Sequence, residues 1–266
     1  MRTIQQLVSV VGVALLAACA VLQNTPSPEV RQALAPTGTL RVGLVNGAPA
    51  NVVRDPGSGE MKGVSYDLGR ELARRLGVPF EPVFYPSIGA LLDAGRSAQW
   101  DVTFNPVTAD RSKYLDFTAP HLEIEFGYLV AADSRISRFE DVDLPGVRVA
   151  VSEKGAADVL LSHALKNAVV VRGPGLPGAL ELVKSRKAEV FAANKPNVFE
   201  MSRLLPGSRV LDGRPGIETH AMAMPKGRDA GMVYARKFVE DAKSGGLVKA
   251  AIERAGLRGA VVAPLQ

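Results

Sequence analysis

Short apolar runs alternate with segments of helical period along residues 40–130. Continuous or alternating apolar residues predict strands at 40–45, 80–85, 100–104 and 126–130. Helices are predicted at 65–76 and 88–94. In the first helix, Leu68, Leu72 and Leu76 fall on one face, and Gly77 is placed to end it. The order β-α-β-α-β up to residue 104 predicts a parallel sheet with helices on both faces.

The alternation restarts after residue 130. A helical turn at 139–142 is followed by strands at 147–151, 169–172, 189–192 and 220–224, with helices at 155–165, 178–184 and 196–204. Two final helices, 229–243 and 247–255, have no strands of their own, so we expect them to pack on the first unit. The chain would then cross twice between two lobes, a geometry suited to closing on a ligand. We predict lobe 1 from 38–128 with 223–266, and lobe 2 from 129–222.

The first 37 residues follow neither pattern. Met1 and Arg2 precede an apolar stretch, Leu7 to Ala18, that is too short to span a bilayer and fits the core of a signal peptide. The end of this stretch, Leu16-Ala17-Ala18-Cys19, is similar to a lipobox, in which the cysteine becomes the diacylated first residue. We therefore predict a signal peptide over 1–19, a lipid anchor at Cys19 and a flexible tether over 20–37. An ordinary signal peptide with a cysteine nearby by chance is the alternative.

Composition narrows the classes of function. The 266 residues are 47% hydrophobic and 22% charged, with a net charge of +5. The basic residues are scattered and aromatics are only 6%, which argues against a nucleic-acid-binding protein. A mild positive field suits small anionic ligands. Cys19 is the only cysteine, and His121, His163 and His220 lack metal-ligand spacing, so we expect no metal and no cofactor.

Six segments in order resemble the family 3 (amino-acid-type) solute-binding proteins of bacterial ABC importers. They are Leu40–Gly43, Lys62–Leu68, Trp100–Arg111, Leu115–Pro120, Phe139–Val142 and Gly146–Val151, and the resemblance spans roughly residues 38–258. It implies the type II periplasmic-binding-protein fold, in which two α/β lobes with parallel or mixed sheets are flanked by helices and joined by a two-strand hinge. It also implies a periplasmic protein that works with an ABC permease, and with the lipid at Cys19 we expect it to be anchored to a bacterial membrane. We expect a monomer.

Arg111 is the first candidate for a ligand contact. In amino-acid binders of this family, the Arg of the T-x-x-R segment clamps the ligand α-carboxylate, and that position is Arg111. A guanidinium can meet a carboxylate with two parallel hydrogen bonds and stays charged when it is desolvated. The alternative is a surface Arg paired with Asp110 or Asp116.

The remaining positions depart from the family pattern. Pro106 replaces the usual hydroxyl residue, Val45 an early-strand Asp, and Ala48 or Pro49 the aromatic lid. Gly155 and Ala156 replace a Ser/Thr pair at a helix start, where free N–H groups are able to bind an anion. Asn194 replaces the Asp that accepts the α-ammonium. With no anionic partner left for an ammonium, we expect a carboxylate ligand without a required amine.

Further candidates lie on the same side of the expected cleft. Asn46, Asn105, Thr108, Lys154 and Lys195 are candidates for polar contacts with the ligand. Phe104 and Tyr85 are candidates for an apolar wall, whereas Trp100 begins a strand and is expected in the core. Glu123 and Glu125 share one side of a strand and are expected to form a polar face.

A binding protein that delivers its ligand to an importer is the favoured function, with no catalytic residue. One alternative is an enzyme on the same scaffold, because relatives of this family include cyclohexadienyl dehydratases. That chemistry needs a general acid in the cleft, and Glu153 and Asp110 are the only candidates for it. The other alternative is a sensor that signals through a membrane partner.

Overall fold

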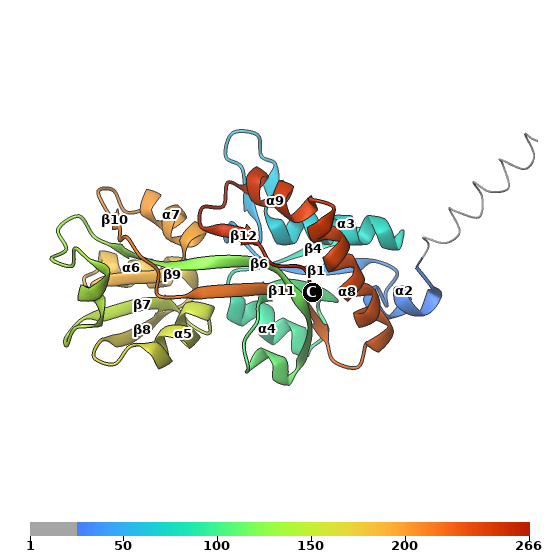
Figure 1. The fold of residues 1–266 in the computed structure, drawn as a ribbon, viewed down its shortest axis with the longest axis horizontal. Coiled ribbons are helices and arrows are strands. Elements are labelled where there is room, and N and C mark those ends of the chain that lie inside the picture. Colours follow the sequence, from blue (N-terminus) through green and yellow to red (C-terminus); the bar gives the residue numbers. More distant parts are fainter. Residues whose placement is uncertain (1–25) are drawn as a thin grey trace, which may run out of the picture.

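The computed structural model describes residues 26–266, which form two α/β lobes joined by two long strands (Figure 1). The first lobe contains α2 (Pro28–Leu34), β1 (Leu40–Val45), β2 (Val53–Arg54), β3 (Met61–Lys62), α3 (Val64–Leu76), β4 (Phe80–Tyr85), α4 (Ile88–Arg96), β5 (Val102–Pro106) and the 3₁₀ turn η1 (Arg111–Lys113). The strand β6 (Leu115–Val130) then leads to the second lobe.

The second lobe contains η2 (Phe139–Asp143), β7 (Arg148–Ser152), α5 (Ala156–Ala164), β8 (Val169–Gly173), α6 (Gly175–Lys184), β9 (Val190–Asn194), α7 (Lys195–Arg203) and β10 (Arg209–Val210). The chain returns through β11 (Ile217–Pro225) and ends in α8 (Asp229–Ser244), α9 (Leu247–Ala255) and β12 (Ala260–Val262). Most of these bounds lie within a few residues of the predicted ones.

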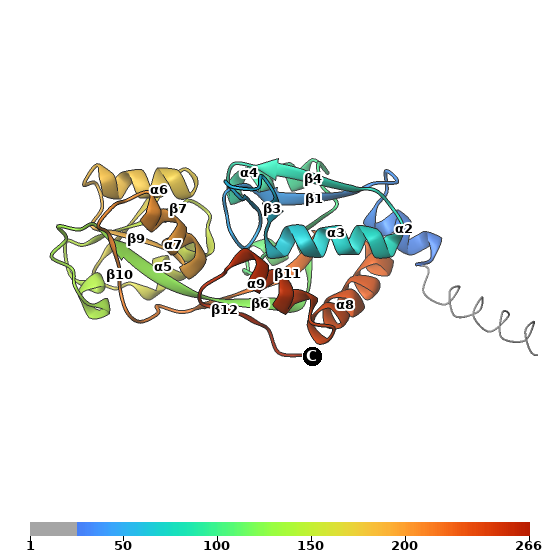
Figure 2. The same cartoon turned by 90° about the horizontal axis from the view of Figure 1, so that it is seen from above.

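Eight strands from both lobes form one continuous hydrogen-bonded path, in the order β4-β1-β5-β11-β6-β9-β7-β8, while β10 and β12 pair with β6 beside this path and β2 pairs with β3 in a separate sheet. β1 runs parallel to β4 and β5, and β7 runs parallel to β8 and β9. β6 changes partner along its length: it pairs with β11 as far as Glu125 and with β9 from Phe126 onward. β6 and β11 therefore make the hinge between the lobes (Figure 2). The predicted boundaries after 128 and before 223 stay predictions.

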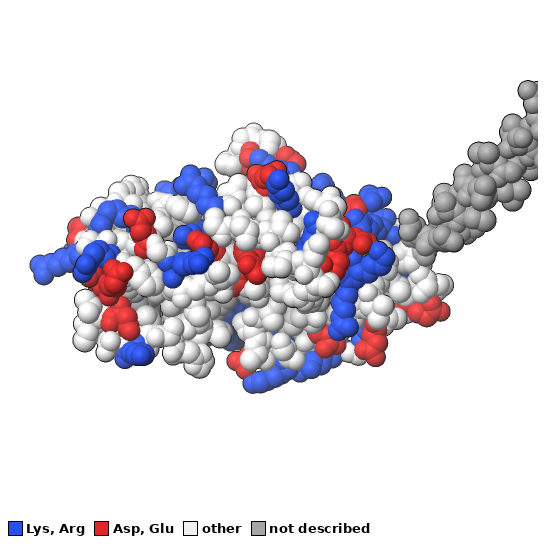
Figure 3. Space-filling model, viewed as in Figure 1, with Lys and Arg blue, Asp and Glu red and all other residues white. Residues whose placement is uncertain are grey.

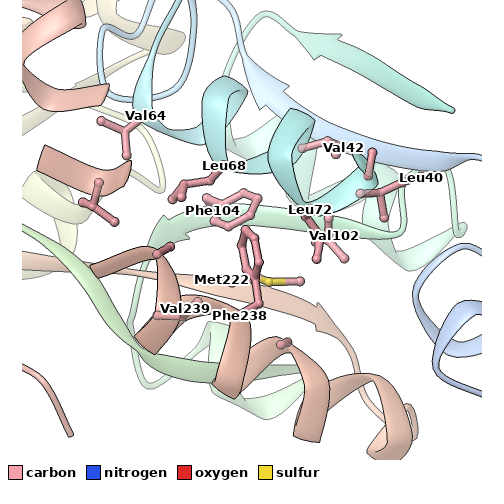
Figure 4. Packing of buried hydrophobic residues seen from close by; sticks show 14 of the residues in the cluster. Leu40, Val42, Val64, Leu68, Leu72, Val102, Phe104, Met222, Phe238 and Val239 are labelled. Atoms are coloured by element: carbon pink, nitrogen blue, oxygen red, sulfur yellow. The ribbon is translucent and has the colours of Figure 1, made fainter. Parts of the chain in front are cut away.

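The two final helices share a hydrophobic cluster with the first strands of the chain. Phe238 and Val239 of α8 pack with Leu68 of α3 and Met222 of β11, as Figure 4 shows. Val248 and Ala251 of α9 belong to the same cluster. In the second lobe, separate clusters lie on the two faces of the sheet, under α5 and under α6 with α7. Burial on both faces is typical of parallel strands.

The predicted flexible tether at 20–37 is wrong for its second half, because residues 28–34 form α2. Ser27 caps this helix by accepting a hydrogen bond from the N–H of Val30 at 3.4 Å, and Pro28 occupies the first turn. Leu34 is fully buried in the cluster that also contains α8. The signal peptide, Cys19 and the first tether residues lie outside the described residues.

Within residues 26–266, no helix is long and apolar enough to cross a membrane. The same residues contain no group of three or more His, Cys, Asp or Glu side chains placed to hold a metal ion. On the face drawn in Figure 3, basic and acidic side chains are mixed over both lobes.

Candidate functional site

A cavity of about 350 Å³ lies between the lobes. It is lined at the carboxyl ends of parallel strands from both lobes: Val45 of β1 and Pro106 of β5 on one side, Ser152 of β7 and Asn194 of β9 on the other. Ligands of open α/β sheets bind at this edge, because the following loops and helix N-termini converge there. Glu218 and His220 of the hinge strand β11 complete the wall.

Arg111 lies at the start of η1 with only 3% of its surface exposed. Its Nη1 donates to the carbonyl of Pro106 at 2.7 Å, and its Nη2 donates to the carbonyl of Lys154, in the opposite lobe, at 3.0 Å. A guanidinium carries five N–H donors, so three have no partner within residues 26–266. Asp110 pairs instead with Lys113 at 2.6 Å.

Among the described residues, no carboxylate forms a direct ion pair with the desolvated guanidinium of Arg111. Burial lowers the pKa of the Arg111 guanidinium, and the negative charge of Glu218 opposes that shift. Because an arginine stays protonated even when its pKa falls, the cavity wall carries a buried positive charge. A buried cation is costly unless an anion meets it with good geometry. The arrangement therefore favours an anionic ligand group.

Glu218 is the centre of a buried polar cluster in the same wall. Only 7% of the surface of Glu218 is exposed. Its Oε1 lies 2.7 Å from His220 Nε2 and 2.6 Å from Asn194 Nδ2. Asn194 also caps α7, since its Oδ1 accepts the N–H of Asn197 at 3.1 Å. These two contacts fix the orientation of the Asn194 amide, with oxygen toward the helix and nitrogen toward the carboxylate.

Asn51 and Asn105 form a second polar group in the cavity wall. Asn51 Oδ1 accepts the N–H of Val45 at 3.2 Å, and its amide nitrogen lies 3.4 Å from Asn105 Oδ1. Asn105 in turn donates to Thr103 Oγ1, and that hydroxyl donates to the carbonyl of Gly43 at 2.8 Å. Both amides are therefore held by the ends of β1 and β5.

The second lobe presents the start of α5 to the cavity. Gly155 is the N-cap and has no side chain to cap the helix, and Gly155, Ala156 and Ala157 line the cavity at the start of α5. A Cβ on Gly155 would lie 2.8 Å from the carbonyl oxygen of Ser152, which explains the glycine. Lys154 contributes its carbonyl to Arg111, while its Nζ lies 3.9 Å from Asp93.

Six of the predicted site residues line the cavity: Arg111, Asn46, Asn105, Gly155, Ala156 and Asn194. The side chains of Phe104, Thr108 and Lys154 do not. Thr108 supports the turn instead, because its Oγ1 accepts the N–H of Arg111 at 3.3 Å. Lys195 lies outside the cavity and pairs with Glu125 at 2.6 Å.

Phe104 was predicted at the cleft, and the structure places it in the core of the first lobe. It is fully buried beside Leu68 and meets the His121 ring edge-on, with 5.6 Å between ring centroids (Figure 4). Successive residues of a strand point to opposite faces, so Asn105 faces the cavity and Phe104 cannot. Trp100 is in the core, as predicted, and donates to the Leu91 carbonyl at 2.8 Å.

Sequence reasoning missed Glu218, His220 and Asn51. The cavity does contain a carboxylate that the sequence analysis does not name, since Glu218 lines it together with Arg111. That the ligand requires no amine stays a prediction. A signal was present: Glu218 and His220 are two residues apart, so they share one face of a strand. The predicted strand began at His220 and left Glu218 outside it.

Two α/β lobes around a cavity with a buried arginine define the class of two-lobed binding proteins. Residues 40–255 match the model of the family described as bacterial extracellular solute-binding proteins, family 3. The chain belongs to this family.

Solved structures show the same fold. A mutant of ArgBP from T. maritima is 23% identical, with a TM-score of 0.72 over 86% of this chain and 99% of that chain. The solute receptor for L-cysteine of Neisseria gonorrhoeae is 18% identical, with a TM-score of 0.75 over 90% and 100%. An ancestral amino acid-binding protein, a precursor of cyclohexadienyl dehydratase, is 25% identical, with a TM-score of 0.68 over 83% and 96%.

Proposed function

We propose that this protein captures a small carboxylate-bearing ligand in the interlobe cavity and delivers it to an ABC permease. The observation that carries the proposal is Arg111: it is buried, lines the cavity and keeps three N–H donors without a protein partner within residues 26–266. A carboxylate is the group that a guanidinium binds with two parallel hydrogen bonds. The ligands named for the similar structures, among them lysine and L-cysteine, all carry one.

The bonds of Arg111 also support a role in closing the lobes. The hydrogen bond from Arg111 Nη2 to the Lys154 carbonyl joins the first lobe to the second. A ligand held by the same guanidinium is then enclosed between the lobes, which suits a protein that captures a solute and hands it on.

Binding and uptake together test this function. Calorimetry with a panel of small carboxylates is expected to find at least one ligand. A strain that lacks the protein is expected to lose uptake of that radiolabelled ligand and to recover it from a plasmid copy. Binding without any effect of the deletion on uptake would contradict the importer role and favour a sensor.

We also propose that Cys19 is lipid-modified and anchors the protein to a bacterial membrane. The support is the Leu16–Cys19 pattern at the end of an apolar stretch and the absence of any other cysteine. Cells labelled with an alkyne fatty acid are expected to give a labelled protein, and Cys19→Ala is expected to give an unlabelled one. An unlabelled wild-type protein, or one that begins elsewhere than at Cys19, would refute the anchor.

The cavity supports binding better than catalysis. Neither carboxylate nominated as a general acid lines it, since Glu153 is exposed and Asp110 is an exposed partner of Lys113. Glu218 lines the cavity, but Asn194 and His220 both direct a nitrogen to it. Oε1 of that carboxylate is therefore already engaged within the protein.

A further inference from the structure

The cavity wall carries a carboxylate and an imidazole that contact each other. Glu218 and His220 are two residues apart on β11, so both side chains project from the same face of the strand. Glu218 Oε1 lies 2.7 Å from His220 Nε2, and both residues are buried and line the cavity. One of these two atoms must donate to the other, so the contact contains a proton. Two groups this close bind and release protons as a pair.

The pair has two atoms at which a second proton can bind. His220 Nδ1 is buried and has no hydrogen-bond partner within residues 26–266. The amide nitrogen of Asn194 also donates to Glu218 Oε1, and no donor among the described residues reaches Glu218 Oε2. A proton added to Nδ1 or to Oε2 therefore breaks none of the hydrogen bonds that hold the pair.

The buried charges of the cavity wall balance one another. Arg111 is positive, and the Glu218–His220 pair, with the proton in its contact, is negative. Glu200 also lines the cavity, but it pairs with Arg203 at 2.8 Å. A ligand that adds a carboxylate and no cation leaves this wall with a negative charge that nothing offsets. An uncompensated charge is costly in a buried site.

The histidine and lysine on the neighbouring elements do not offset this charge. Burial lowers the pKa of His121 on β6 well below its usual range, and a positive charge on His220 or Lys243 lowers it further. His121 therefore stays neutral when the pair takes up a proton. Lys243 of α8 is already paired with Glu240 at 2.7 Å.

The other charged groups around the hinge are engaged elsewhere or face away. Glu123 of β6 lies opposite Thr219 in the register, so it shares the face of the sheet that Glu218 does not use. The remaining ion pairs near the hinge are Lys195 and Arg214 with Glu125, and Lys154 with Asp93.

We propose that Glu218 and His220 form a proton-binding site, which takes up one proton when a carboxylate without an amino group binds to Arg111. The inference rests on the proposed function, because it assumes that Arg111 anchors a carboxylate. The proton cancels the charge that the ligand adds to the buried wall. Because the two binding events are coupled, the proton raises the affinity for the carboxylate, and the carboxylate raises the affinity for the proton.

Calorimetry on the wild-type protein counts this proton. Acetate, lactate, pyruvate and benzoate are suitable probes, because each is fully ionised near neutral pH and any proton taken up goes to the protein. Each probe is titrated in two buffers with different ionisation enthalpies, and the difference in heat gives the number of protons. For every probe that binds, we expect uptake close to one proton and an affinity that falls about tenfold from pH 7 to pH 8.

Glu218→Gln is expected to remove both effects. Glutamine has nearly the same size, and without the negative charge the wall is balanced by the ligand carboxylate alone. The variant should therefore bind the same probe with no proton uptake and with an affinity independent of pH. Glu123→Gln is the matched control on the hinge, because Glu123 does not line the cavity, and it should behave like the wild type. Melting temperatures check that both variants are folded.

The outcomes separate this inference from the proposed function. Binding of a probe to the wild type without proton uptake would overturn the inference and leave the proposed function standing. Proton uptake that persists in Glu218→Gln would also overturn it, since the proton would then bind elsewhere. If other carboxylates bind but none of the four probes does, the inference fails alone. If no carboxylate binds at all, the proposed function fails with it.

Discussion

Arg111→Met is expected to abolish binding of any carboxylate that the wild-type protein binds. The variant removes a buried, charge-assisted contact, which costs about 2–5 kcal/mol of binding free energy, or roughly 30-fold or more in affinity. Methionine keeps an unbranched apolar side chain in place of the aliphatic part of the arginine, so the loss reports mainly on the charge and hydrogen bonds of the guanidinium. Calorimetry with a ligand found in the carboxylate panel measures it.

Two controls accompany this test: the melting temperature of Arg111→Met, and ligand binding by a variant of a second arginine outside the cavity. The variant loses two hydrogen bonds to backbone carbonyls, but it also removes the free-energy cost of burying a cation. Because these effects oppose each other, the melting temperature is expected to shift by about 3 °C or less. Arg209 also donates to two backbone carbonyls, those of Ser134 and Ile136, at 3.1 Å each, and it does not line the cavity. Arg209→Met should bind like the wild type. Equal binding by Arg111→Met would remove the basis of the proposed function.

Gly63→Ala is expected to destabilise the first lobe and weaken binding together. Gly63 precedes α3 with φ +155°, and a Cβ there would overlap the carbonyl of Asn51 and lie 2.9 Å from Cα of Val52. That carbonyl accepts the N–H of Tyr66, so the start of α3 holds the loop that carries Asn51 into the cavity. Backbone strain and overpacking together should cost about 3–5 kcal/mol of unfolding free energy.

Thermal melting measures this effect, and a fall on the order of 10 °C is expected for a chain of this size. Gly77→Ala, at the other end of α3, is the control. Gly77 also has a positive φ, +68°, but a Cβ there would meet nothing within 4 Å. It should therefore cost only about 1–2 kcal/mol, the penalty for a left-handed residue with a side chain. Equal effects of the two variants would show that the contact with Asn51 is unimportant.

The order of elements could be predicted because each carries its own local pattern. The apolar face of α3 lies within thirteen consecutive residues, and the glycine that ends the helix is the next residue. Both features can therefore be recognised without knowledge of distant contacts. The sequence predicts a tether where α2 forms, although Ser27 and Pro28 make a good helix start, because prolines in a polar segment are also typical of tethers. Its stability depends on Leu34, whose partners on α8 are about two hundred residues away in sequence.

The cavity residues that could be predicted from the sequence are those at or near the carboxyl ends of strands. Arg111, Asn105 and Asn194 lie at or just after the carboxyl ends of β5 and β9, and parallel strands bring such ends together. Glu218 lies on an antiparallel strand that returns through the hinge. Its position in the cavity depends on which way β11 faces, and that is set by pairing with β5 and β6.

The bond between Arg111 and the Lys154 carbonyl has a consequence for the speed of capture. One guanidinium in the cavity wall joins the two lobes. We expect the lobes to separate only while this bond is broken, so that a ligand enters the cavity during those intervals. The apparent association rate is then the intrinsic rate multiplied by the fraction of time spent open. Once the ligand is inside, the same bond is expected to slow its escape, so it should contribute both to the waiting time before capture and to the residence time after it.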